Sequence, residues 1–321
     1  MINIAYNGER DKVAFKDIFA SVIPELCETR DDVIYLDADL MSCIGTYKWA
    51  KTHPDKAINC GISESNMVGV AAGLAASGFK PIVHSFGPFA SRRVFDQVFL
   101  SAAYAGNDIT VIGSDPGVCA MYNGGTHMPF EDTGLYRTVP GATVIDIADT
   151  VMLRDVLKKC VDMKGVKYIR VGRKNNGKIY GDGSEFEIGK AVELRKGGDA
   201  VIFACGIMVF EAMKAAETLA AEGIETAVVD VFTVKPIDAE AVLKYALETG
   251  AVVVTENHNR IGGLVSAVSE TLAGKFAGPF GYVAVEDEFG EVGTLGYLQE
   301  RFGLTAEHLA DEVRRAVKAK K

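Results

Sequence analysis

The feature that most constrains the fold of this chain is a repeated alternation between short β-branched runs and longer helical segments. The helical segments are alanine-rich or amphipathic, and the runs between them are too short to be helices. Strands that alternate with helices form parallel sheets, because each crossover helix returns the chain to the same end of the sheet. In the first part of the chain we expect strands at 33–36, 81–84, 110–113, 142–146 and 167–171, and helices at 66–77, 91–104 and 150–160.

The alternation restarts after a polar, glycine-rich stretch at 174–184, which we interpret as a linker. Two domains suit a chain of 321 residues. We therefore predict an α/β protein with two three-layer αβα domains, each with a mostly parallel sheet, at 1–180 and 189–321. In the second domain we expect strands at 200–204, 226–230 and 251–255, and helices at 209–222 and 239–248.

The composition argues against several classes of function. The net charge is −9, and no basic cluster is denser than the tail at 318–321, so the basic surface needed for nucleic-acid binding is missing. No apolar stretch approaches the roughly 20 residues of a membrane span, and the N-terminus lacks the layout of a signal peptide. The six cysteines and five histidines are dispersed, which indicates reduced thiols and no metal site within this chain. We expect a cytoplasmic protein.

A glutamate at the start of a predicted helix is the first candidate functional residue. Glu64 lies in the sequence GISESNM at residues 61–67, where a strand-like run turns into a helix rich in small residues at 68–76. Taken alone, a glutamate in the first turn is commonly only a charge matched to the helix dipole. The small residues would equally suit tight helix packing, so the residue needs further support.

That support comes from a resemblance: residues 61–76 are similar to the pyrimidine-binding domain of transketolases and their relatives, which use thiamine diphosphate. In that family a glutamate in a Gly-hydrophobic-x-Glu-x-x-Met setting contacts a ring nitrogen of the cofactor's aminopyrimidine, and this position is Glu64 here. A partly buried carboxyl group favours the imino tautomer, whose exocyclic nitrogen takes the proton from the thiazolium carbon. The resemblance implies thiamine diphosphate as cofactor and a catalytic, cofactor-binding role for Glu64.

Two phenylalanines follow the predicted strand at 81–84. Aromatic residues in such a place usually belong to the core, but transketolases stack aromatics from this segment on the pyrimidine ring, and Phe86 and Phe89 have the matching spacing. The resemblance thus implies that both bind the cofactor. The family's next aromatic is replaced by Arg92, so the third wall of the pocket is open. Arg92 and Arg93 could instead form a solvated face or contact another subunit.

A long glycine-rich loop at 114–132 carries the next candidates, since loops of this length commonly serve a site. Its sequence NGGTH at 123–127 resembles the Asp-Gly-x-Thr-His loop of the sugar-handling members of the family. The resemblance implies that His127 faces the reacting carbon and handles a proton, and that Asn123 binds substrate. The family's acidic residue is Asn123 here, and Asp115 lies near a position that often holds a phosphate-contacting histidine. An aspartate would repel phosphate.

Two further positions match the family. Asp39, in the sequence LDADLMS at 36–42, matches an aspartate near the cofactor, although alone it would be read as a turn residue. Arg173 aligns with an arginine that can hold the anionic end of a substrate, a task suited to bidentate guanidinium geometry. A surface salt bridge is nearly as good an explanation of Arg173. Ser42 and Cys43 match a phosphate-contacting position only loosely.

The resemblance extends to the second domain but stops short of a whole transketolase. Residues 198–206, 235–238 and 256–258 resemble the family's C-terminal domain, where we expect no catalytic role for His258. The Gly-Asp-Gly at 181–183 lies in the linker, and no asparagine follows it at 204–216 to complete a magnesium site. We therefore expect a separate N-terminal subunit to supply the diphosphate-binding domain and the Mg²⁺ ligands, in a heterotetramer.

These features together predict the C-terminal subunit of a split transketolase, which moves a two-carbon ketol unit from a ketose to an aldose. Three alternatives stay open. The beta subunit of a 2-oxo acid dehydrogenase shares both domains, but the loop at 123–127 resembles the sugar-handling enzymes more closely. A deoxyxylulose-phosphate synthase is usually one unbroken chain. A catalytically silent scaffold would not need Glu64, Phe86 and His127 together.

Overall fold

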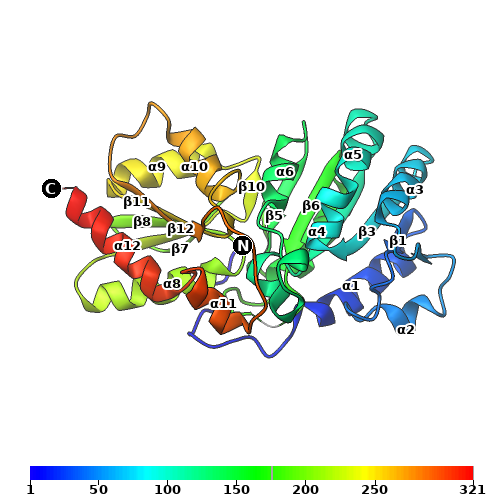
Figure 1. Ribbon diagram of the computed structural model, residues 1–321, viewed down its shortest axis with the longest axis horizontal. Helices are drawn as coiled ribbons and strands as arrows, with labels where there is room; N and C mark the ends of the chain where they lie inside the picture. The colour runs from blue at the N-terminus through cyan, green and yellow to red at the C-terminus, as the bar shows by residue number, and fades with distance from the viewer. Residues whose placement is uncertain (175, 321) are drawn as a thin grey trace.

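The computed structural model describes residues 1–174 and 176–320. Asn175, inside the predicted linker, and Lys321, at the end of the basic tail, lie outside the described residues. The chain forms two lobes side by side, each with a sheet between layers of helices (Figure 1). The predicted α/β architecture of two αβα domains is confirmed.

The first sheet has seven strands in the order β10-β5-β6-β4-β3-β1-β2. The six strands from the first domain pair in parallel, and most of them are buried along their whole length, as strands covered on both faces must be. Their bounds are β1 (Val33–Asp37), β2 (Ala57–Asn59), β3 (Lys80–Phe86), β4 (Ile109–Ser114), β5 (Thr143–Asp146) and β6 (Val166–Val171). The carboxyl ends of these parallel strands meet at one edge, where sites of open α/β sheets form.

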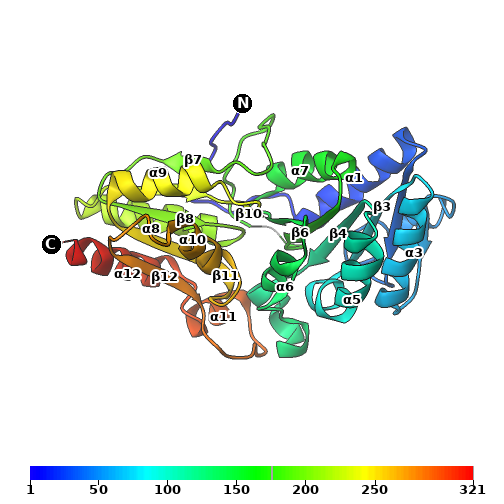
Figure 2. The same ribbon diagram turned by 90° about the horizontal axis from the view of Figure 1, so that it is seen from above.

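Helices cover both faces of this sheet, with α1 and α7 on one side and α3, α5 and α6 on the other (Figure 2). Helix α1 is not predicted from the sequence, because Pro24 inside it is a helix-breaking signal. The α-helices are α1 (Phe15–Thr29), α2 (Tyr47–Ala50), α3 (Glu64–Ala76), α4 (Gly87–Ala90), α5 (Phe95–Gln97), α6 (Asp132–Thr138) and α7 (Thr150–Asp162). Shorter or wider turns form η1 (Arg92–Val94), η2 (Val98–Tyr104), η3 (Gly117–Asn123) and η4 (Gly125–His127).

The helix predicted at 91–104 is confirmed as a helical segment from residue 92 to residue 104, but it is not one regular α-helix. Ser91 leaves helical geometry, with φ −120° and ψ −90°, and the segment continues as η1, α5 and the π-helical η2. The hydroxyl of Ser65 donates to the carbonyl of Arg93 at 3.0 Å, which ties η1 to α3. The break fixes where Arg93 points.

The second sheet has five strands in the order β12-β11-β8-β9-β7, parallel except for the edge strand β7. Helices α9 and α10 pack on one face, and α8 and α12 on the other (Figure 1). The strands are β7 (Val192–Arg195), β8 (Ala200–Ala204), β9 (Thr226–Asp230), β11 (Val252–Asn259) and β12 (Phe280–Val285). The helices are α8 (Met208–Ala221), α9 (Ala239–Thr249), α10 (Leu264–Leu272), α11 (Leu295–Arg301) and α12 (Ala306–Ala319).

One strand crosses from the second domain to the first. β10 (Thr233–Lys235) pairs antiparallel with β5 and closes the edge of the seven-stranded sheet, with Thr233 opposite Ile145. The predicted linker is likewise fixed: Tyr180 is buried, its hydroxyl donates to Asp230 at 2.7 Å, and Ile4 bridges to it from the N-terminal segment. The two domains therefore share backbone pairing as well as side-chain contacts.

A buried group of charged side chains also joins the domains. We call Arg170, Asp132, Asp146, Glu256 and His258 the interdomain cluster. Arg170 of β6 donates to Asp132 at 2.9 Å and to Asp146 at 2.8 Å, and is fully buried. From β11, Glu256 accepts the first amides of α10 at 2.6 and 2.8 Å, while His258 Nε2 lies 3.9 Å from Asp132. This arrangement compensates buried charge with opposite charge and backbone donors.

None of the helices formed by the described residues combines the length and the apolar character that crossing a bilayer requires.

Candidate active site

An aromatic cluster lies at the carboxyl edge of the first sheet. We use this name for Phe86, Phe89 and His127. Phe86 ends β3, Phe89 lies in the short α4 that follows it, and His127 comes from η4. The imidazole centroid is 6.1 Å from the ring of Phe86 and 5.1 Å from that of Phe89, both edge-on. Three of the predicted site residues are therefore in contact.

Glu64 begins α3 beside this cluster. Its carboxyl group is buried, with 3% of the side chain exposed, and Oε1 accepts from Arg93 at 2.7 Å and from the hydroxyl of Ser85 at 3.5 Å. The N-terminus of a helix favours a negative charge at this position. A carboxylate that is nearly removed from water needs such partners, and Arg93, Ser85 and the start of α3 provide them.

Arg93 joins Glu64 to the aromatic cluster. Its guanidinium carbon is 3.9 Å from the centroid of the Phe89 ring, while its Nη1 holds the Glu64 carboxylate. From the sequence, a solvated face or a subunit contact is expected for Arg93. The structure shows it 42% exposed and in contact with two predicted site residues. No sequence signal separates it from its neighbour Arg92, because only the break at Ser91 decides which arginine faces α3.

Arg92 points to the loop that carries His127. It donates to Glu131 at 2.8 Å and to the carbonyl of Thr126 at 3.1 Å, and the hydroxyl of Thr126 lies 2.9 Å from Nδ1 of His127. The position that holds an aromatic wall in the family is thus occupied by a residue that supports η4. Arg92 helps to fix the orientation of the imidazole from behind.

Arg173 lies on the other side of the cluster, with its guanidinium carbon 4.7 Å from the centroid of the Phe86 ring. Its Nε donates to Asp115 at 2.6 Å, and its backbone amide donates to the same carboxylate at 3.1 Å. Asp115 is buried and has a φ of +54°, a strained conformation for a residue other than glycine. The charge of Arg173 is therefore largely balanced by Asp115.

Asp39 and Asn123 are exposed near the same edge of the sheet. Asp39 has a φ of +64° and accepts from the side-chain amide of Asn59 at 3.0 Å, at the end of β2. Asn123 ends η3. Among the described residues, no hydrogen bond, ion pair or ring contact connects either of them to the aromatic cluster, so their roles are open to proposal only.

A buried polar chain connects two of these turns and was not predicted. His84 Nδ1 is 2.7 Å from Asp37, its Nε2 is 2.9 Å from the hydroxyl of Ser114, and the Tyr35 hydroxyl donates to Asp37 at 2.5 Å. Asp37 precedes the turn of Asp39, and Ser114 precedes Asp115. Because His84 is fully buried, this chain holds the turns in place and cannot reach a substrate.

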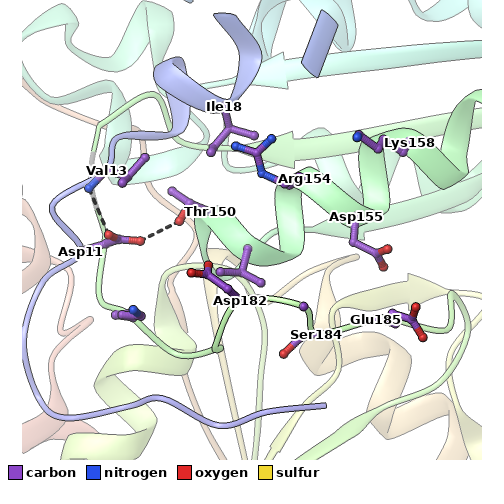
Figure 3. A pocket seen from close by; sticks show the side chains of 13 residues that line it. Asp11, Val13, Ile18, Thr150, Arg154, Asp155, Lys158, Asp182, Ser184 and Glu185 are labelled. Atoms are coloured by element: carbon purple, nitrogen blue, oxygen red, sulfur yellow. Dashed lines mark hydrogen bonds between the residues drawn. The ribbon is translucent and has the colours of Figure 1, made fainter. Parts of the chain in front are cut away.

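A separate hollow lies between the N-terminal segment, α7 and residues 178–185 (Figure 3). It has a volume of about 570 Å³ and is lined by charges of both signs, including Asp182 of the Gly-Asp-Gly sequence. Asp11 there accepts from Thr150 at 2.6 Å and from the amide of Val13 at 3.0 Å. None of the predicted catalytic or binding residues lines it, so its size alone does not make it the site.

Family models match nearly the whole chain. The transketolase pyrimidine-binding domain matches residues 11–178, and the transketolase C-terminal domain matches residues 189–309. The chain belongs to the transketolase family. Membership implies dependence on thiamine diphosphate in general.

Individual relatives agree with this assignment. A 6-deoxy-6-sulfo-D-fructose transketolase subunit of Clostridium sp. strain MSTE9 is 48% identical over 294 residues, covering 92% of this chain and 91% of that subunit. Human transketolase is 32% identical over 95% of this chain, but the match spans only 49% of the human protein. A solved structure of a split gene transketolase, an inactive beta4 tetramer, matches with a TM-score of 0.87 and 35% identity, covering 97% of this chain and 100% of the other.

The residues present fit part of such a cofactor. The buried carboxylate of Glu64 offers a hydrogen-bond acceptor to a planar ring with polar edges. The nearby ring of Phe89 offers a flat surface on which such a ring can stack. Among the described residues, no group of three histidine, cysteine, aspartate or glutamate side chains is placed to hold a metal ion. The buried carboxylate and the aromatic ring thus suit the aminopyrimidine end of the cofactor.

Proposed function

We propose that this chain is the C-terminal subunit of a split transketolase, which transfers a two-carbon ketol unit from a ketose to an aldose in the cytoplasm. The observation that carries the proposal is the buried carboxyl group of Glu64, held at the edge of the aromatic cluster at the start of α3. Burial next to a flat aromatic surface is the environment that activation of an aminopyrimidine requires.

The candidate site residues have different roles that follow from their positions. When bound, thiamine diphosphate supplies the nucleophile and the electron sink of the transfer. Glu64 holds a proton between its carboxylate and the ring nitrogen, and Phe86 and Phe89 bind the flat ring. His127, fixed from behind by Thr126, takes or gives a proton at a substrate oxygen. Asp39 would approach the cofactor and Asn123 a substrate hydroxyl group, since both lie on exposed turns.

A partner subunit would complete the enzyme. This chain matches about half of human transketolase, and the described residues hold no metal-binding group. We propose that an N-terminal subunit supplies the diphosphate-binding domain and the Mg²⁺ ligands, in a heterotetramer with two copies of each chain. The inactivity of the beta4 tetramer in the matched split gene transketolase supports this view.

The ion pair between Arg173 and Asp115 bears on the substrate. A doubly charged phosphate approaching Arg173 would also meet the buried carboxylate of Asp115, whereas a singly charged or uncharged end would suffer less repulsion. A sulfonate carries one charge, and the relative at 48% identity is named for a sulfonated sugar. We therefore propose a sugar whose terminal group is a monoanion or is neutral.

The test begins with co-expression of the chain and a candidate N-terminal subunit. Calorimetry of this chain alone should show no tight binding of thiamine diphosphate, while the complex should bind it in the presence of Mg²⁺. Tight binding by the isolated chain would refute the need for a partner.

Substrate choice is then read by mass spectrometry with matched donors whose terminal group is a phosphate, a sulfonate or a hydroxyl. We expect transfer from the sulfonate or hydroxyl donor to exceed transfer from the phosphate donor. In Asp115→Asn the preference should move toward phosphate by about 10-fold, because one nearby negative charge is gone. An unchanged ratio would remove Asp115 from substrate selection.

A further inference from the structure

The guanidinium of Arg93 makes two contacts at once. It donates from Nη1 to Glu64 at 2.7 Å, and it lies over the ring of Phe89 at 3.9 Å. Its backbone is anchored separately, because the hydroxyl of Ser65 binds its carbonyl group at 3.0 Å. The side chain can therefore move while the main chain stays in place.

A guanidinium and an aminopyrimidine share the features that these contacts use. Both are flat and delocalised, and both can form an N–H···O hydrogen bond with a carboxylate, the guanidinium from its own N–H groups and the ring nitrogen through the proton it shares with Glu64. The function proposed above uses the same carboxylate and the same aromatic ring for the cofactor. Two flat groups cannot lie on the same face of Phe89 while both bind Oε1 of Glu64.

We infer that Arg93 is a displaceable placeholder, whose guanidinium occupies the surface of Glu64 and Phe89 that the aminopyrimidine of thiamine diphosphate takes on binding. The inference rests on the proposed function for the identity of the cofactor. It assigns a role to Arg93, which lies outside the predicted site. It also explains why the guanidinium of Arg93 fills the place where the cofactor's aminopyrimidine ring would bind.

The placeholder keeps Glu64 paired. A buried carboxylate without a partner is costly, and Arg93 provides one until the ring arrives. The exchange is feasible because 42% of the Arg93 side chain already faces water, where the displaced guanidinium is well solvated. After the exchange, the Glu64 carboxylate has lost its nearby positive charge, and it takes up a proton from water that it then shares with the ring nitrogen. Binding of the cofactor and release of Glu64 from its ion pair with Arg93 thus occur together.

The test compares cofactor affinity in the complex with the N-terminal subunit, by calorimetric titration with thiamine diphosphate at saturating Mg²⁺. Arg93→Ala removes the competitor, and we expect the dissociation constant to fall by about 10-fold, the size of one partly exposed ion pair and its cation–π contact. Arg93→Lys should give an intermediate value, because an ammonium keeps the ion pair and loses the flat stacking.

Arg260→Ala is the matched control. Arg260 is 44% exposed and pairs with Glu286 at 2.8 Å, so it has nearly the same exposure and the same kind of partner, in the second domain. Its removal should leave the dissociation constant unchanged. Methylguanidinium chloride provides a second readout: it should compete with the cofactor in the Arg93→Ala complex and not in the wild type, which a purely structural role of Arg93 would not produce.

Equal or weaker binding by both Arg93 variants, with the wild-type complex binding normally, would overturn the inference and leave the proposed function standing. If the wild-type complex binds no thiamine diphosphate, the proposed function fails and the inference fails with it. Should Arg93→Ala not fold, the Arg93→Lys titration decides alone, since lysine preserves the charge beside Glu64.

Discussion

At the candidate active site, Arg93 pairs with Glu64 and keeps 42% of its side chain exposed, whereas in the interdomain cluster Arg170 pairs with Asp132 and Asp146 and is 1% exposed. Both regions use an arginine against carboxylates. The first pair has a face open to solvent and one aromatic neighbour, so one partner can be exchanged. The second is closed on every side, so removing any member leaves an uncompensated charge. Both pairs consist of an arginine and carboxylates, so the difference in solvent access is what makes the Arg93 pair replaceable and the Arg170 pair fixed.

The largest expected effect is on chemistry at the open site. Glu64→Gln keeps the size of the side chain but removes the group that shares a proton, so turnover of the reconstituted complex should fall by roughly 1,000-fold or more. The melting temperature should change little, because glutamine fills the same buried space and Arg93, which loses its ionic partner, is 42% exposed to water. Steady-state turnover and thermal melting measure the two effects. Normal turnover would show that Glu64 is not the activating residue.

The next effect is on stability at the closed cluster. Arg170→Met leaves Asp132 and Asp146 buried without their cation, and the free energy of unfolding should fall by about 3–5 kcal/mol. Urea denaturation measures it. Arg260→Ala, which breaks a surface pair, should cost less than about 1 kcal/mol. Similar losses in the two variants would erase the distinction between open and closed pairs.

A smaller effect is expected at the aromatic cluster. His127→Ala removes a proton-handling ring but leaves Phe86 and Phe89 in place, so carbon transfer should slow by about 100-fold while cofactor affinity changes little. Turnover and calorimetry of the same complex separate the two quantities. A large loss of cofactor affinity with near-normal turnover would move His127 away from the reacting centre.

The smallest expected effect is the pH dependence of stability that arises in the interdomain cluster. Burial raises the pKa of Glu256 from 4.5 to about 7 and lowers the pKa of His258 from 6.5 to about 4. The stability from protonated Glu256 is full below pH 4.5 and lost as the pH rises to about 7. The stability from neutral His258 is full above pH 6.5 and lost as the pH falls toward 4. Between pH 4.5 and 6.5 the two slopes oppose each other.

Replacing Glu256 or His258 alone should remove the contribution of that residue to the pH dependence of the free energy of unfolding. Relative to the wild type, the free energy of unfolding of Glu256→Gln should rise with pH in this window, and that of His258→Asn should fall, each by up to about 1.4 kcal/mol per pH unit. Urea midpoints across a pH series provide the measurement. The same pH profile in both variants would contradict the opposing assignments.

The sequence predicts the parts of the fold that depend on local pattern. Short β-branched runs between helical segments predict β1, β4 and β6 within a residue or two. It does not predict β10, a short segment whose partner β5 is distant in sequence. The helix at 91–104 is predicted as one regular helix because its composition is helical, while the structure divides it into the consecutive turns η1, α5 and η2.

The candidate site follows the same division. Glu64, Phe86, Phe89 and His127 are found through spacing within motifs, and the structure places the last three in contact. The role of Arg93 depends on the direction of one side chain after a backbone break, which no motif encodes. His84 is a polar residue in a largely buried strand, and its two partners come from β1 and β4. Such relations exist only once the sheet has formed.

The crossing of β10 has a consequence for engineering. Because this strand from the second domain completes the sheet of the first, a cut at the sequence boundary between the domains would leave β5 with an unpaired edge. A first domain expressed alone should therefore be prone to aggregation. A chimaera that exchanges second domains between relatives would need a β10 whose register matches the recipient's β5, so the exchangeable unit is defined by strand pairing and not by the linker.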